Sequence, residues 1–121
     1  MNPPLLSIFA AVLIGTTAAL PDSIDQAISK YCTGPLWENG TYPIIEIAAN
    51  TPIEEKVFLI AEKWGHSRKT VKIIKIKEIH LNVGGEPNRS CTAALLKTEV
   101  GDKVLVFDND VHCWSRLVNV N

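Results

Sequence analysis

The longest strand-like pattern in the chain covers residues 70–88, where apolar and polar side chains alternate. The apolar parity changes between Ile73 and Ile74, and it changes back between Ile76 and Ile79. Period-2 alternation indicates one buried and one wet face, so each change predicts a bulge or a break between two strands. Gly84 and Gly85 are predicted to end this run, with the following residues, 86–90, in a loop.

The clearest helix is predicted over residues 51–64. Thr51 and Glu54 have the spacing of a capping box, with Pro52 at the first helical position and Gly65 as the stop. One apolar stripe at helical spacing is expected to be buried: Ile53, Val57, Ile60, Ala61 and Trp64. Residues 22–30 are compatible with a short helical turn or a loose leader. Residues 33–40 are typical of a turn or a hairpin tip.

Four further segments predict strands: residues 42–49, 91–98, 103–107 and 111–118. Pro43 favours an edge position or a strand start for the first of them. The last three are joined by short turns and predict an antiparallel meander. The expected fold class is therefore α+β, with one α-helix packed on a twisted antiparallel sheet.

The first residues differ in composition from the rest of the chain. No charged side chain precedes Asp22, and residues 5–14 form an apolar run shorter than a membrane span. Residues 1–20 are predicted to be a secretory signal peptide, with an uncleaved anchor as the alternative. Of the 121 residues, 21–121 then form a single small domain.

Formal net charge is −1, so overall charge does not indicate a nucleic-acid partner. A basic run nevertheless occupies the middle of the chain: Lys63, His66, Arg68, Lys69, Lys72, Lys75 and Lys77. Such a run either attracts an anion such as RNA or is a solvated strand edge on which lysine prevents aggregation. Asn39 and Asn88 begin glycosylation sequons in turn-like sequence.

The chain has three cysteines: Cys32, Cys91 and Cys113. Export favours oxidation, and the odd number leaves one thiol unpaired. A Cys32–Cys113 bond would tie the two ends of the domain together, whereas Cys91–Cys113 would join two predicted strands. No cysteine or histidine spacing supports a metal site, and no cofactor is expected.

The predicted strand also carries the best candidates for chemistry. Glu78, His80 and Asn82 share one face of it, opposite Ile79 and Leu81. A carboxylate and an imidazole two residues apart on one face lie about 7 Å apart along the strand. The simpler interpretation is a solvated strand face followed by a plain Gly-Gly turn.

The layout resembles the RNase-like effectors of powdery mildew fungi, which are small secreted virulence proteins on the scaffold of fungal guanyl-specific ribonucleases. The residues that carry the resemblance are Tyr31 and Cys32, Gly84 and Gly85, residues 95–101 and 104–107, and Cys113. Tyr31 adjoins Cys32 here, whereas the family often has one residue between them. The resemblance implies a ribonuclease-like fold and a Cys32–Cys113 disulfide, with Cys91 reduced and buried.

By this resemblance, Glu78 corresponds to the catalytic base, Arg89 to the arginine that stabilises the phosphorane charge, and His112, loosely, to the general acid. His80 has no firm counterpart. The known effectors mostly lack the catalytic set, so the resemblance favours a monomeric, secreted, non-catalytic protein that binds host RNA or a host protein, outside or inside host cells. An active ribonuclease is the alternative. RNA would be bound by the central basic residues Lys69, Lys72, Lys75, Lys77 and His80.

A second interpretation does not depend on the family. The chain could be a small secreted binding or inhibitor module whose predicted loops, residues 33–40 and 84–90, contact a protein. Such a module would need neither Glu78 nor His112. Tight binding of RNA to the purified protein would separate the two interpretations.

Overall fold

A computed structural model describes residues 22–120, so the predicted signal peptide lies outside the described residues. Its centre is a five-stranded antiparallel sheet in the order β1-β5-β4-β3-β2. The strands are β1 (Ile44–Glu46), β2 (Lys72–Val83), β3 (Glu86–Thr98), β4 (Gly101–Asp108) and β5 (His112–Asn119). The α+β class and the antiparallel meander are confirmed, and β1 lies at the sheet edge.

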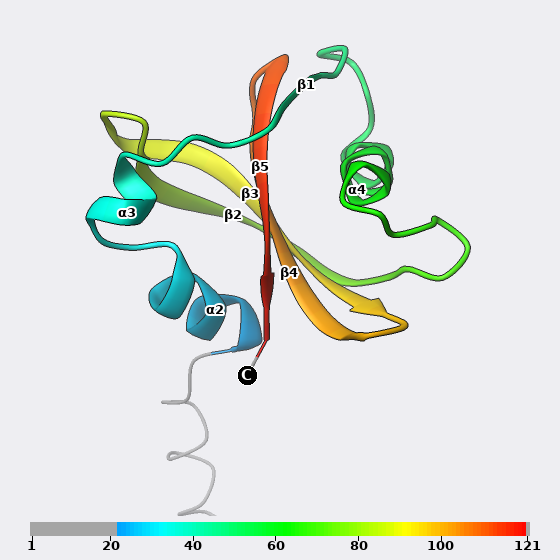
Figure 1. Cartoon of the computed structure of the whole chain (residues 1–121). Coiled ribbons are helices and arrows are strands. Elements are labelled where there is room, and N and C mark those ends of the chain that lie inside the picture. Colours follow the sequence, from blue (N-terminus) through cyan, green and yellow to red (C-terminus); the bar gives the residue numbers. More distant parts are fainter. Residues whose placement is uncertain (1–21, 121) are drawn as a thin grey trace, which may run out of the picture.

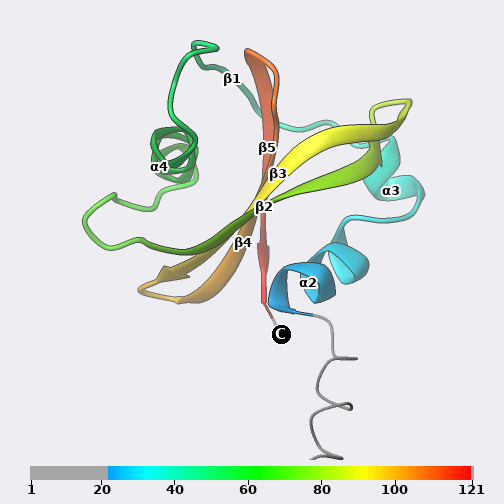
Figure 2. The ribbon, with the colours of Figure 1, turned by 180° about the vertical axis from the view of Figure 1, so that it is seen from behind.

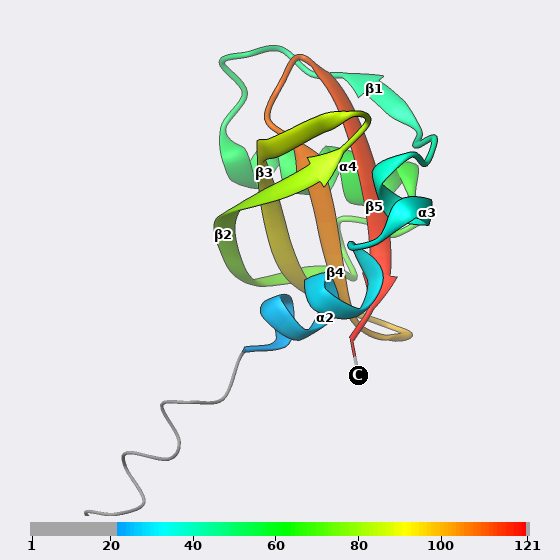
Figure 3. The ribbon, with the colours of Figure 1, turned by 90° about the vertical axis from the view of Figure 1, so that its left-hand side faces the viewer.

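Helices cover both faces of the sheet. Helices α2 (Ser23–Tyr31) and α3 (Pro35–Glu38) lie on one side, and α4 (Ile53–Lys63) lies on the other (Figures 1 and 2). Turned by 90°, the molecule shows α2 and α3 in front of the strands and α4 behind them (Figure 3). The single packed helix predicted from the sequence is therefore only one of three in the described residues, and the sheet is the middle layer.

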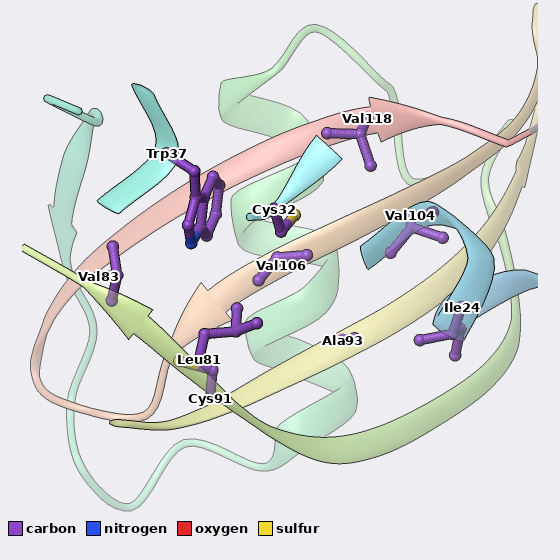
Figure 4. Close-up of a cluster of buried hydrophobic side chains, with 11 residues drawn as sticks. Ile24, Cys32, Trp37, Leu81, Val83, Cys91, Ala93, Val104, Val106 and Val118 are labelled. Atoms are coloured by element: carbon purple, nitrogen blue, oxygen red, sulfur yellow. The ribbon is translucent and has the colours of Figure 1, made fainter. Parts of the chain in front are cut away.

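Each face of the sheet has its own core. Figure 4 shows the core beneath α2 and α3, where Ile24 and Trp37 from the helices meet Leu81, Val104 and Val106 from the strands. The second core lies beneath α4 and contains Val57 and Ile60 with Leu96, Leu105 and Phe107. Strands β3 and β4 therefore bury side chains of both parities, which explains their nearly continuous apolar sequence.

The two parity changes in residues 70–83 have different causes. A register shift between Ile73 and Lys75 leaves Ile74 as an extra, 48 % exposed residue, so the first change is a bulge. Pairing then continues without a break from Lys75 to Leu81. Ile76 packs against the α4 core and Ile79 against the opposite core. The second change is therefore a switch between two buried faces.

The Gly-Gly turn is tighter than expected. Gly84 and Gly85 have φ angles of 61° and 81°, the left-handed values that a two-residue hairpin requires at both central positions. Strand β3 consequently begins at Glu86. The prediction of a loop through residues 86–90 is wrong, and Arg89 is a strand residue.

Helix α4 differs from the prediction at its start. Pro52 is the N-cap, with an extended backbone and no side-chain cap hydrogen bond, so the predicted Thr51 capping box does not form. Ile53 is 41 % exposed, so the prediction that it belongs to the buried stripe is wrong. Val57 and Ile60 are fully buried, as predicted. Trp64 caps the helix C-terminus, and its indole N–H donates to Ser115 Oγ at 2.9 Å.

The N-terminal segment is helical, as one of the two alternatives expected. Asp22 is the N-cap of α2, and its carboxylate accepts a hydrogen bond from the Asp25 amide at 2.8 Å. Ile24 and Ala27 are the buried residues of this helix. The predicted turn at residues 33–40 contains the short helix α3, which Pro35 starts.

Candidate functional site

The row of polar residues on β2 lies at an edge of the sheet. Glu78 pairs with Thr92 and His80 with Ser90 across the β2–β3 ladder. Ser90 Oγ donates to Glu78 Oε2 at 2.8 Å, so the neighbouring strand holds the carboxylate in place. Glu78 and His80 are both exposed. The predicted shared face therefore exists, and it is open to water.

A hydrogen-bonded chain extends this row to the β4–β5 turn. Asn109 donates from Nδ2 to Ser90 Oγ at 3.1 Å, and Thr92 Oγ1 donates to Asn109 Oδ1 at 2.5 Å. Asn82 accepts at Oδ1 from the Asn88 amide at 2.8 Å. Asn88 has a φ of 55°, a left-handed conformation that asparagine adopts more readily than most residues. These bonds position the turn residues and orient Glu78.

Arg89 is held by carboxylates. Its Nε donates to Asp108 Oδ1 at 3.1 Å and its Nη2 to Oδ2 at 3.0 Å, a bidentate pair. Arg89 also bonds Glu86, and Asp110 lies 3.6 Å away. The hydrogen bonds that Arg89 donates, first to Asp108 and then to Glu86, raise the pKa of Arg89 above its usual value. The Asp108 side chain is only 5 % exposed, so Arg89 neutralises a buried charge.

His112 is placed at the other end of the strand order. It begins β5, where it pairs with Glu46 of β1, and its Nδ1 lies 3.3 Å from Glu46 Oε2. Both side chains are largely exposed, at 67 % and 74 %. Strands β4 and β3 lie between β5 and β2, which at a spacing of 4.8 Å places the strand of Glu78 about 14 Å away.

The three catalytic candidates therefore do not converge. Glu78 is on the face that carries Ile76 and α4, whereas Arg89, paired with Leu81, is on the face beneath α2 and α3. General acid–base catalysis needs its groups within hydrogen-bond reach of one reacting centre. Each candidate has a local partner instead, in Ser90, Asp108 and Glu46 respectively.

Half of the predicted RNA-binding lysines are engaged inside the protein. Lys75 Nζ lies 2.8 Å from Asp22 Oδ2, and Lys77 Nζ lies 2.7 Å from Asp25 Oδ1 and 3.5 Å from Asp22 Oδ2. The hydrogen bond from Lys75 holds the pKa of Asp22 well below its usual range. These pairs fasten the start of α2 to β2. The positive charges of Lys75 and Lys77 are therefore already neutralised by carboxylates of the protein itself.

The remaining candidates of the basic run face solvent. Lys69 lies in the turn before β2, and Lys72 is an exposed β2 residue directly opposite Lys97 on β3. Two like charges in register repel each other, and an anion between them would relieve this. Arg68 pairs with Glu55 at 2.7 Å and stacks over the Phe58 ring at 4.8 Å. Among the predicted RNA-binding lysines, all within the described residues, those left to attract an anion are therefore Lys69 and Lys72, just before and at the start of β2.

The cysteines do not follow the pairing implied by the resemblance. All three are free and buried. Cys32 belongs to the core under α2 and α3, with Cys91, whereas Cys113 belongs to the α4 core on the other side of the sheet. A Cys32–Cys113 bond would have to pass through the sheet, an arrangement that the observed positions of the two thiols do not favour. Burial raises the pKa of Cys32 and of Cys91 to about 12 and that of Cys113 to about 11.

An aromatic cluster was missed by the sequence analysis. The Trp37, Tyr42 and Trp114 rings have centroids 4.9–5.8 Å apart, and the Arg116 guanidinium lies over Trp37 and Tyr42 at 5.8 and 5.6 Å. Tyr42 Oη donates to the Trp37 carbonyl at 2.7 Å. Alternation along β5 puts Trp114 and Arg116 on one face of the strand. Trp37 belongs to α3 and Tyr42 precedes β1, so no local sequence signal linked these two residues to that face.

Several surface predictions can be placed in the fold. Both sequon asparagines, Asn39 and Asn88, are exposed. Within residues 22–120, no group of three or more metal-binding side chains comes together, and no helix is long and apolar enough to cross a membrane. Compared with models of protein families, with curated proteins and with solved structures, the chain has no significant match.

Proposed function

We propose that the chain is a secreted, non-catalytic binding protein of the kind that the RNase-like fungal effectors represent, with a host protein as its partner. A ribonuclease-like ancestry of the fold and virulence activity belong to this proposal. The observation that carries it is the engagement of Arg89 by the buried Asp108 carboxylate. An arginine that neutralises a buried charge is not available to stabilise a phosphorane.

Two further observations support a binding role. Glu78 and Arg89 project from opposite faces of the sheet, and His112 is three strands away from Glu78 in the strand order. The separation of base and acid removes the concerted proton transfers of ribonuclease chemistry, which are worth about 10²–10⁴ in rate. Lys75 and Lys77 are neutralised by α2, which favours a protein partner over RNA.

RNA binding remains a second candidate because of one observation. Lys72 and Lys97 face each other, no carboxylate among residues 22–120 forms an ion pair with either, and Lys69 precedes them at the same end of β2. A few lysine–phosphate contacts would give weak binding that falls steeply with salt. A Lys72→Ala substitution should then weaken binding more than Lys75→Ala, because Lys75 already has Asp22 as its partner.

The test is a titration of labelled RNA at low and moderate salt, beside a gel assay for chain breaks. We expect no cleavage, together with binding that is weak and salt-sensitive or undetectable. Cleavage that disappears in Glu78→Ala would overturn the proposal and make the chain a ribonuclease. Tight binding to RNA in moderate salt, lost in Lys72→Ala, would make RNA the partner. Secretion is tested separately, by fusing residues 1–20 to a reporter that must be exported.

A further inference from the structure

A cavity lies between strand β1 and helix α4. It has a volume of about 750 Å³ and is open to solvent on one side. One wall is the β1 strand with its flanking residues, and the other is the side of α4 that carries Leu59, Glu62 and Lys63. Those three helix residues share one side because they are spaced three and four apart. We call this cavity the β1–α4 groove.

The strand wall of the groove is an open sheet edge. Strand β1 pairs only with β5, and Figures 1 and 3 show it at the margin of the sheet. The Pro43 carbonyl accepts from Ser115, and the Ile47 amide donates to Val111, so these two residues face β5. Hydrogen bonding alternates along an antiparallel strand, so the backbone N–H and C=O groups of Ile44 and Glu46 turn the other way.

The side chains at this edge favour contact with a partner. Ile44 is 64 % exposed, which is unusual for a large apolar residue of a strand. The other edge of the sheet, β2, carries Lys72, Lys75 and Lys77, the residues with which proteins discourage strand addition. Strand β1 carries no lysine, but it is only three residues long and follows Pro43, so the part of this edge that is open to pairing is limited to Ile44–Glu46.

We propose that the β1–α4 groove binds an extended segment of the partner protein, which adds to β1 as a further strand. This inference rests on the proposed function. The open donors and acceptors of Ile44 and Glu46 would hold the segment's backbone, and alternate side chains would lie against Leu59 and the isoleucines. Of the two carboxylates in the lining, Glu46 already lies beside His112, so Glu62 is the one that a lysine or arginine among the segment's apolar residues would meet.

The experiment starts from a display library of random linear peptides selected on the purified, folded protein. Selected peptides are synthesised, and their binding is measured by titration and by backbone amide shifts in NMR spectra. We expect alternating apolar residues with one basic residue, and shift changes concentrated at residues 44–47 and 59–63. The lysines of strand β2, Lys72, Lys75 and Lys77, should not respond.

Two pairs of variants test the mode of binding. Ile44→Pro removes an N–H that points away from β5, a position at which edge strands tolerate proline. Ile44→Val is its comparison, because valine keeps the N–H and the branched apolar shape. We expect Ile44→Pro to bind about three- to tenfold more weakly than Ile44→Val, the equivalent of one hydrogen bond. Glu62→Lys, at an exposed helix position, should weaken binding of the basic peptides, and Glu62→Gln should weaken it less.

Defined results overturn the proposal. It fails if the library yields no binder, if binders shift amides elsewhere, or if Ile44→Pro and Glu62→Lys both bind like the wild type. It also fails if the free protein dimerises and shifts the same amides, because a second copy would then occupy the groove. A host protein that still binds Ile44→Pro and Glu62→Lys would refute the groove alone, whereas RNA cleavage dependent on Glu78 would refute the proposed function.

Discussion

Replacing Arg89 by alanine separates a catalytic from a structural role for this residue. In a ribonuclease, Arg89→Ala would abolish cleavage and leave the fold intact. Here we expect the opposite, a large loss of stability, because the substitution removes both hydrogen bonds to Asp108 Oδ1 and Oδ2. The Asp108 carboxylate would remain almost fully buried without its arginine, and Glu86 and Asp110 would lose the same cation.

The size of the loss follows from burial. Removing one partner of a buried ion pair costs about 3–5 kcal/mol, because the other charge is left uncompensated. Arg89 itself is 27 % exposed, and water can partly replace it, so we expect about 2–4 kcal/mol for Arg89→Ala. For a domain of about 100 residues this lowers the melting temperature by about 10–20 °C.

The assay is urea unfolding followed by tryptophan fluorescence, with thermal melting beside it. The matched control is Arg68→Ala, which breaks the exposed pair with Glu55 and should change the melting temperature by little. The double variant Arg89→Met/Asp108→Leu removes both charges and should recover much of the stability lost in Arg89→Ala. An Arg89→Ala protein that melts like the wild type would refute the assignment of a structural role.

Two further predictions concern the cores. Val57→Ala should cost about 1–3 kcal/mol, because Val57 is fully buried under α4, whereas Ile53→Ala should change the unfolding free energy by less than about 0.5 kcal/mol; equal urea midpoints for the two would show that α4 faces elsewhere. All three thiols should be unreactive towards a thiol reagent at pH 8 in the folded protein and should all react in denaturant. Because burial raises the pKa of Cys32 and Cys91 to about 12, the unfolded chain, with thiols near 8.5, loses protons first. Stability should therefore be complete below about pH 8.5 and decline as pH rises towards 11, by about 1.4 kcal/mol per pH unit for each such thiol; a flat profile between pH 8 and 10.5 would contradict it.

Local sequence patterns predicted the helices and strands better than they predicted how these elements pack together. Alternation found β2 and the meander, and helical spacing found α4, because these signals depend on neighbouring residues. The second parity change in β2 was misinterpreted because it reports that both faces of the sheet are covered, a property of the tertiary packing. Gly84 and Gly85 indicated the end of the strand and a turn, yet residue types did not show that β3 begins immediately after them.

The candidate site shows the same limit. The shared face of Glu78 and His80 followed from period-2 alternation alone and is present in the structure. The partners of Arg89 and Lys75 could not be read from the sequence, because Asp108 and Asp22 are distant along the chain. Nor could the groove, which forms only where β1 and α4 come together. Arg89, Lys75 and Lys77 were predicted to be available for a ligand, but each already has a carboxylate partner.

The buried, unpaired thiols have a consequence for how the fold responds to a reductant. Cys32 and Cys91 lie in one core and Cys113 in the other, each packed as a small apolar side chain. Each thiol therefore stabilises its core by packing, and residues 22–120 contain no cross-link that a reductant could break.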